Sequence, residues 1–164
     1  DFKNIKTDLK RLGYSTYLID LARQVEKQKE NSEIFNILEA SLLKIEKSFD
    51  PVVITNIAEL KYLSFLGVAP VFDKCAVCGG NKDIITVNSD AGGYICKNCY
   101  TTEYIADEKT LKLLRMFNFV DISKIKELNI LEKNKKEINK FLEDYYTKYT
   151  GLYLKSKDFL SQIK

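Results

Sequence analysis

The sequence predicts a mainly α-helical domain, a helical bundle, interrupted by a small four-cysteine module with a short β-hairpin. Its 164 residues include only two prolines and seven glycines, and so few interruptions favour long helices. Apolar residues recur at helical spacing along most of the chain. The cysteines form two C-x2-C pairs between positions 75 and 99.

The composition limits the class of protein. Hydrophobic residues make up 45% of the chain and charged residues 30%, as in an ordinary globular domain. The longest apolar stretch, residues 62–72, is broken and much shorter than a membrane span of about 18 residues. The chain starts at Asp1 without a basic, apolar leader, so we expect a fragment of a larger protein without a signal peptide. It contains no histidine, which excludes Ser-His-Asp and Cys-His catalysis and histidine-ligated metal sites.

The first 70 residues predict three helices. The first runs from Asp8 to about Gln28 and carries two apolar faces, which imply burial on two sides. One face consists of Leu9, Leu12, Ile19 and Ala22, and the other of Tyr14, Leu18, Leu21 and Val25. A second helix follows a cap at Asn31 or Ser32 and continues to Phe49. A third begins with Asp50 as the cap and Pro51 as the first residue, reaches about Phe65 and ends at Gly67.

The last 60 residues or so predict further helices. One is capped by Asp107, and a short one starts at Asp121 or Ser123. A longer helix starts with a capping-box pattern at Asn134 and Glu137 and closes near Gly151, and a last turn follows from Ser156. The predicted helical domain therefore comprises residues 1–70 and 106–164, interrupted by the module at residues 71–105.

The module predicts a metal site. Cys75 and Cys78 are followed, after seventeen residues, by Cys96 and Cys99, a spacing typical of zinc. Two thiolates three positions apart on a tight turn can face one ion, and a hairpin from runs 84–87 and 93–95 would bring both pairs together. Four thiolates leave no open position, so the predicted Zn²⁺ is structural. Two disulfides, four unrelated buried thiols and a rubredoxin-like iron centre are the alternatives.

Few other residues suggest chemistry. The net charge is +3, and residues 121–164 hold ten basic against seven acidic side chains, which indicates a solvated helix face or a shallow phosphate-binding surface. Lys155 and Lys157 flank Ser156 at a predicted helix start, where they could hold a phosphate. An aromatic stripe in the preceding helix favours a buried core position over a base-stacking platform. Its members are Phe141, Tyr145, Tyr146, Tyr149 and Tyr153.

Several segments resemble one family. They are "LKYLSFLGVAPVFDKCAVCGG", "GGYICKNC" and "YYTKYTGLYLKSKDFL". Together they are similar to the C-terminal helical part of the bacterial recombination mediator RecO, and the resemblance covers roughly residues 1–163. Family members usually carry arginine near the closing motif, where this chain has Lys157.

The resemblance implies a non-enzymatic role in DNA repair. It implies zinc on the four cysteines, a preceding OB-fold domain that supplies much of the single-stranded DNA binding, and a location in the bacterial cytoplasm at the nucleoid. It also implies strand annealing, contact with the single-strand-binding protein, and loading of the recombinase together with RecR. Lys155 and Lys157 are the predicted nucleic-acid contacts of this part.

Two other functions remain open from the residues. One is a zinc-braced adaptor that binds proteins and no nucleic acid. The other is a thiol-disulfide oxidoreductase, which would need one exposed thiolate of low pKa.

Overall fold

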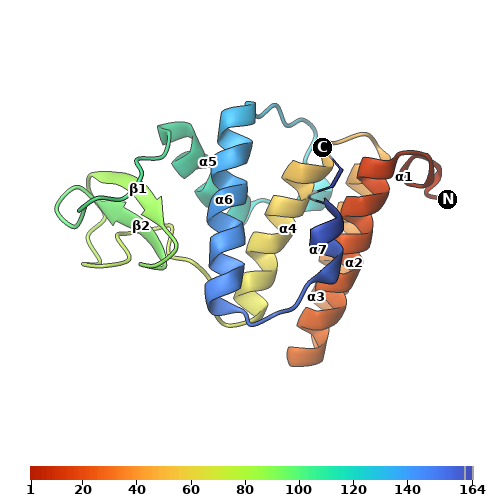
Figure 1. The fold of residues 1–164 in the computed structure, drawn as a ribbon, viewed down its shortest axis with the longest axis horizontal. Coiled ribbons are helices and arrows are strands. Elements are labelled where there is room, and N and C mark those ends of the chain that lie inside the picture. The colour runs from red at the N-terminus through yellow and green to blue at the C-terminus, as the bar shows by residue number, and fades with distance from the viewer. Residues whose placement is uncertain (161, 164) are drawn as a thin grey trace.

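The computed structural model describes residues 1–160, 162 and 163. Two strands, β1 (Ile84–Asn88) and β2 (Gly93–Cys96), form an antiparallel hairpin at one end of a helical bundle (Figure 1). The helices are α1 (Lys3–Thr7), α2 (Leu9–Gln28), α3 (Ser32–Glu46), α4 (Pro51–Phe65), α5 (Glu108–Phe119), α6 (Glu132–Tyr149) and α7 (Lys155–Leu160), with a 3-10 turn η1 (Ile122–Lys124). The predicted fold class is confirmed.

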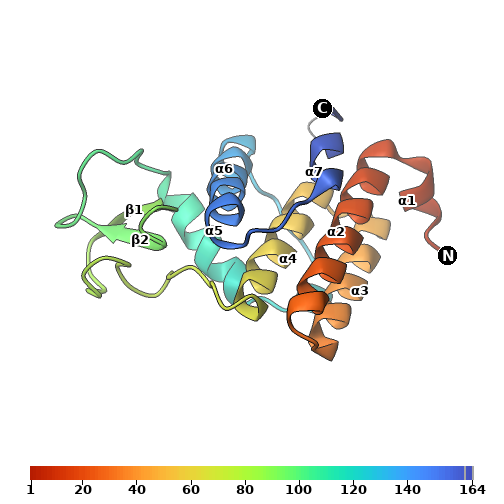
Figure 2. The ribbon, with the colours of Figure 1, turned by 60° about the horizontal axis from the view of Figure 1, so that its bottom comes forward.

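Helix α4 forms the centre of the bundle. It packs against α2, α3, α5 and α6, and Figures 1 and 2 show it between the α2–α3 side and the α5–α6 side. Its start is the predicted one, because the Asp50 carboxylate accepts a hydrogen bond from the Val52 amide (2.9 Å) and Pro51 is the first helical residue. Most of its residues are buried, including the polar Asn56 and Glu59. Burial all round makes it the framework to which the other helices attach.

Helix α2 has one buried apolar face, whereas the sequence predicted two. Leu18, Leu21 and Val25 are fully buried. In the other set only Ala22 is buried, and Leu9, Leu12 and Ile19 are 60%, 41% and 48% exposed. That part of the prediction is wrong because α3, α4 and α7 cover the remaining sides of α2 and leave this one uncovered.

The capping box predicted at the start of α6 is also wrong. The helix starts at Glu132, so Asn134 lies inside its first turn, and no side chain caps it at Leu131. The Glu137 carboxylate accepts hydrogen bonds from the amide of Asp107 (3.2 Å) and the hydroxyl of Thr110 (2.6 Å) instead. Glu137 therefore fastens the start of α5 to α6.

Other boundaries differ slightly from expectation. Helix α3 ends at Glu46, before the predicted Phe49, and the predicted short helix after Asp121 is only the turn η1. Among the described residues, no helix is both long and apolar enough to span a bilayer.

Candidate metal centre

Each cysteine pair lies on a turn whose backbone fixes the sulfur positions. In the first turn the Gly79 amide donates to the carbonyl of Cys75 (3.0 Å), and Gly79 has a φ of 77°, a left-handed conformation that glycine adopts without strain. In the second turn the amides of Cys99 and Tyr100 donate to the Cys96 carbonyl at 3.1 and 3.0 Å. Cys96 is also the last residue of β2, so the hairpin carries the second pair directly.

The hairpin also holds the two turns together. The Ala76 amide donates to the Tyr94 carbonyl (2.7 Å), and the Lys97 amide donates to the Asp83 carbonyl (2.8 Å). The first turn is thus hydrogen-bonded to β2, and the second turn to the residue that precedes β1. The predicted hairpin and the predicted pairing of the turns are both present.

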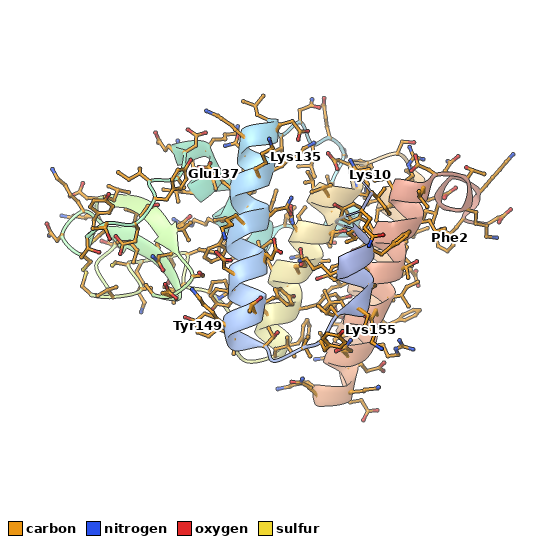
Figure 3. The ribbon with its side chains drawn as sticks, viewed as in Figure 1. Phe2, Lys10, Lys135, Glu137, Tyr149 and Lys155 are labelled. Carbon is orange, nitrogen blue, oxygen red and sulfur yellow. The ribbon has the colours of Figure 1, made fainter. Side chains whose placement is uncertain are left out.

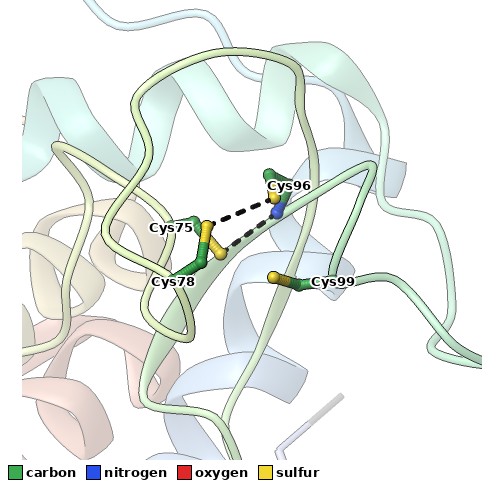
Figure 4. Close-up of side chains that lie close together, drawn as sticks. All are labelled: Cys75, Cys78, Cys96 and Cys99. Carbon is green, nitrogen blue, oxygen red and sulfur yellow. Dashed lines mark hydrogen bonds between the residues drawn. The ribbon is translucent and has the colours of Figure 1, made fainter.

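The four sulfur atoms converge on one point (Figure 4). All four Sγ atoms lie within 4.8 Å of one another, and those of Cys78 and Cys96 are 3.7 Å apart. Tetrahedral zinc with Zn–S bonds of about 2.3 Å requires sulfur separations of about 3.8 Å. A disulfide requires about 2.05 Å, and all four cysteines are free. The donor set therefore fits a tetrahedral thiolate-bound ion.

Backbone amides point at the sulfurs. The amide of Gly80 lies 3.4 Å from Sγ of Cys78, and that of Cys96 lies 3.4 Å from Sγ of Cys75. Burial opposes ionisation of Cys75, but hydrogen bonds from backbone amides outweigh it and lower the pKa of this thiol to about 6. Hydrogen bonds from the Cys99 thiol to the sulfurs of Cys96 and Cys78 raise the pKa of Cys99 to about 12. A bound cation would displace the protons of these thiols, because metal ligation requires thiolates.

An aromatic row connects this module to the bundle. The rings of Tyr94, Phe72, Phe141, Tyr145 and Tyr149 follow one another with centroid separations of 5.2, 5.7, 5.4 and 4.3 Å. Such pairs add about 0.5–1.5 kcal/mol each beyond the area they bury. Phe141, Tyr145 and Tyr149 of the predicted stripe therefore connect to the module, whereas the buried Tyr146 donates to the carbonyl of Glu59 in α4 (2.6 Å). Tyr153 is 69% exposed.

Polar contacts fix the module at the last residue of α6 and at the segment that leads into α5. At the end of α6 the Tyr149 hydroxyl donates to the carbonyls of Ser89 (2.6 Å) and Asp90 (3.0 Å), and Figure 3 shows Tyr149 on the side of α6 that faces the hairpin. Away from α6, the Thr86 hydroxyl in β1 donates to the carbonyl of Tyr104 (2.6 Å) and accepts from the amide of Ala106 (3.0 Å), both in the segment that leads into α5. No sequence signal distinguishes Thr86 from any other strand threonine.

The two lysines predicted to contact DNA lie on α7, on the side of α6 away from the hairpin (Figures 1 and 3). Lys155 is exposed, and its Nζ lies 6.0 Å from the ring centroid of Tyr153. Nζ of Lys157 lies 3.1 Å from a carboxylate oxygen of Glu59, whose side chain is 2% exposed, and 5.2 Å from the ring centroid of Tyr17. The structure therefore gives Lys157 a buried ionic partner and separates both lysines from the four cysteines.

Comparison with known proteins identifies relatives over nearly the whole chain. A family model described as "Recombination protein O C terminal" matches residues 6–158. The chain is 32% identical to a DNA repair protein RecO of Bacillus pumilus over 166 residues, 31% identical to that of Bacillus subtilis over 166 and 30% identical to that of Listeria innocua over 167. Each match covers 99% of this chain but only 65–66% of the relative. The chain thus spans slightly less than two thirds of the length of these relatives.

Proposed function

The chain belongs to the RecO family, and on that premise we propose that it is the zinc-braced helical part of a bacterial DNA repair protein. The observation that carries this proposal is the family match over residues 6–158. The convergence of Cys75, Cys78, Cys96 and Cys99 within 4.8 Å supports the metal assignment. Zn²⁺, when bound, would supply a cross-link between the two cysteine turns, and this part of the protein would work without catalysis.

In the proposed role, the whole protein is a recombination mediator in the cytoplasm. It would anneal complementary strands and, with RecR, load the recombinase onto DNA covered by the single-strand-binding protein. The helical part would provide a rigid scaffold for protein partners, and a preceding OB-fold domain would contribute most of the DNA affinity. A rigid scaffold agrees with the mostly buried α4 and with the contacts that fix the module to the last residue of α6 and to the segment before α5.

Lys155 and Lys157 remain proposed DNA contacts, and their surroundings differ. The ammonium of Lys155 lies near the ring of Tyr153 and has no ion-pair partner among the described residues, so it can meet a phosphate without breaking an ion pair. The Lys157 ammonium would first have to leave Glu59. We therefore expect Lys155 to contribute more to the salt dependence of binding than Lys157.

The full-length protein tests the proposed function. We expect it to anneal complementary strands. The logarithm of its affinity for single strands should fall linearly with the logarithm of the salt concentration, with a slope of about 0.7 for each neutralised phosphate. If it neither anneals nor binds single strands while still binding protein partners, it is a protein adaptor and the mediator role is refuted.

The metal assignment has a separate test on this chain. We expect one zinc per chain by elemental analysis and thiols that resist alkylation until a chelator is added, since bound thiolates are shielded. A metal-free chain with an intact hairpin, or one thiol that reacts at once, would contradict the structural zinc site. The second result would instead favour the oxidoreductase.

A further inference from the structure

One face of α5 combines cations with large apolar side chains. At 100° per residue, the exposed arc of this helix carries Glu108 together with five cationic or apolar side chains, while Leu111, Leu114 and Phe117 on the other side are buried. The five are Lys109, Lys112, Arg115, Met116 and Phe119, named here the α5 face. Phe119 is 72% exposed and Met116 45%. The lysines and the arginine are exposed as well.

The charge of the α5 face is largely uncompensated. Glu108 is its acidic residue, and it pairs with Lys112 at 3.0 Å in a contact whose side chains are 80% and 72% exposed. Such a pair is screened and contributes little. Among the described residues, Lys109 and Arg115 have no ion-pair partner. Three cations against one anion give this short helix a net charge of +2, although the whole chain carries only +3.

A groove beside the α5 face adds a further cation. Phe119 lines a groove of about 580 Å³ together with apolar side chains from α3 and α4, among them Ile37 and Phe65. Lys61 lies half-buried in this groove, and the described residues include no hydrogen-bond acceptor for its ammonium. One oxygen of the nearby Asp121 carboxylate, Oδ1, accepts from the amide and hydroxyl of Ser123 (3.0 and 2.7 Å), while the charge of Asp121 still acts on Lys61. The groove thus combines apolar side chains with a lysine that has no hydrogen-bonded partner, and the carboxylates of Glu33 and Asp121 line it as well.

These features match the chemistry of single-stranded nucleic acid. Its phosphates require cations that are not already paired, and its unstacked bases require exposed aromatic surface. A solvated helix face would explain the lysines, but it gives no role to a phenylalanine that is 72% exposed among them. An acidic protein segment would use the cations and leave the phenylalanine ring without a stacking partner.

We propose that the α5 face, continued by the groove at Phe119, binds single-stranded DNA, with phosphates on Lys109, Lys112 and Arg115 and a base stacked on Phe119. The proposal rests on the DNA repair function proposed above and locates a DNA contact within this chain. Lys109 and Phe119 are about 15 Å apart along the helix at 1.5 Å per residue. The track is separate from Lys155 and Lys157, which lie on α7 beside α2.

The test is binding of a fluorescein-labelled oligothymidine to this chain, followed by anisotropy over a series of salt concentrations. The variant K109Q/K112Q/R115Q should bind more weakly, and its logarithmic salt slope should fall by about two, at about 0.7 per lost phosphate contact. Phe119→Ala should lower affinity by about five- to 150-fold without changing the slope, because a stacked base contributes about 1–3 kcal/mol.

Matched controls lie on the α1–α3 side of the bundle. The variant K27Q/K29Q/K47Q removes the same charge from exposed lysines, and Phe35→Ala removes a phenylalanine that is 62% exposed. Both should bind like the wild type. Equal losses in the control triple variant would mean that only net charge matters, and they would overturn the proposal.

Three further outcomes would also overturn it. In the first, the wild-type chain does not bind the oligothymidine. In the second, K109Q/K112Q/R115Q and Phe119→Ala both bind it as tightly as the wild type. In the third, polyglutamate displaces the oligothymidine and Phe119→Ala has no effect on binding. Annealing by the full-length protein is measured separately. If annealing persists when the α5 variants bind normally, the repair function stands and only this site is refuted.

Discussion

Gly93 allows the chain that precedes the cysteine turns to lie against β2, and an added methyl group should break that contact. Gly93 has a φ of 152°, and a Cβ built there would lie 2.1 Å from the Val71 carbonyl oxygen and 2.7 Å from the Val71 nitrogen. Both are backbone atoms, so no side-chain rotation can relieve the clash. Val71 must move, and it would lose the bonds from its amide to the Gly92 carbonyl and from the Tyr94 amide to its own carbonyl, both 2.9 Å.

The expected cost of Gly93→Ala follows from these losses. Two hydrogen bonds contribute about 1 kcal/mol each, and a side chain at this φ adds about 1–2 kcal/mol of backbone strain. Movement of Val71 also disturbs the adjacent Phe72, whose ring lies between Tyr94 and Phe141, at about 0.5–1.5 kcal/mol for each aromatic pair. Together these losses should lower the free energy of unfolding by about 4–7 kcal/mol.

Gly92→Ala is the matched control. Gly92 has a φ of 90°, but no atom lies within 4 Å of the added Cβ, so only strain of about 1–2 kcal/mol applies. Urea unfolding of both variants measures the difference, and hydrogen exchange at the amides of Val71 and Tyr94 reports whether the expected bonds are the ones lost. If Gly93→Ala is no less stable than Gly92→Ala, the close approach at Val71 is not a constraint and the reasoning is refuted.

Two further perturbations test the contacts of α7 and α5. Lys157→Met should lower the free energy of unfolding by about 1–3 kcal/mol in urea, less than for a fully buried pair because Lys157 is 33% exposed. Adding Glu59→Gln to the Lys157→Met variant should restore part of the lost free energy of unfolding, whereas Lys155→Met alone should change this free energy by less than about 0.5 kcal/mol. Equal losses in Lys157→Met and Lys155→Met would show that Glu59 does not need the Lys157 charge. Acid titration tests Asp107, because the side-chain hydrogen bond from Asn134 lowers the Asp107 pKa. The stabilisation by the Asp107 carboxylate is present above about pH 4 and is lost as pH falls through the lowered folded-state pKa. On acidification the free energy of unfolding should therefore fall more steeply for the wild type than for Asp107→Asn. Parallel curves of unfolding free energy against pH would contradict this.

The parts of the fold that were predicted correctly depend on neighbours in the sequence. Asp50 and Pro51 cap and start α4 through contacts within one turn. The cysteine turns are likewise local, because residues three apart on a tight turn must face the same point. In such cases spacing alone determines the geometry, so the sequence was sufficient.

The errors arise where a side chain serves a distant element. Glu137 reads as a capping residue of α6, but its carboxylate accepts hydrogen bonds from Asp107 and Thr110 at the start of α5. Helix α1 was not predicted, and the carboxylate of Glu46 in α3 accepts from its amides at Asn4 and Ile5, both at 2.9 Å. These two amide hydrogen bonds lower the pKa of Glu46. A cap supplied from another helix leaves no pattern at the helix it caps.

The same reasoning explains why the four-cysteine metal centre could be predicted from the sequence and the α5 face could not. A tetrathiolate centre is specified by four residues of one rare type, and its chemistry does not depend on which other helices pack nearby. The α5 face consists of common residue types, and Lys109, Lys112 and Arg115 look in the sequence like any solvated helix. Only the packing of α5 shows that, among the described residues, Lys109 and Arg115 have no ion-pair partner and that Phe119 stays exposed beside a groove. A binding surface of this kind is defined by what the fold leaves unpaired, and it therefore becomes visible only after the fold is known.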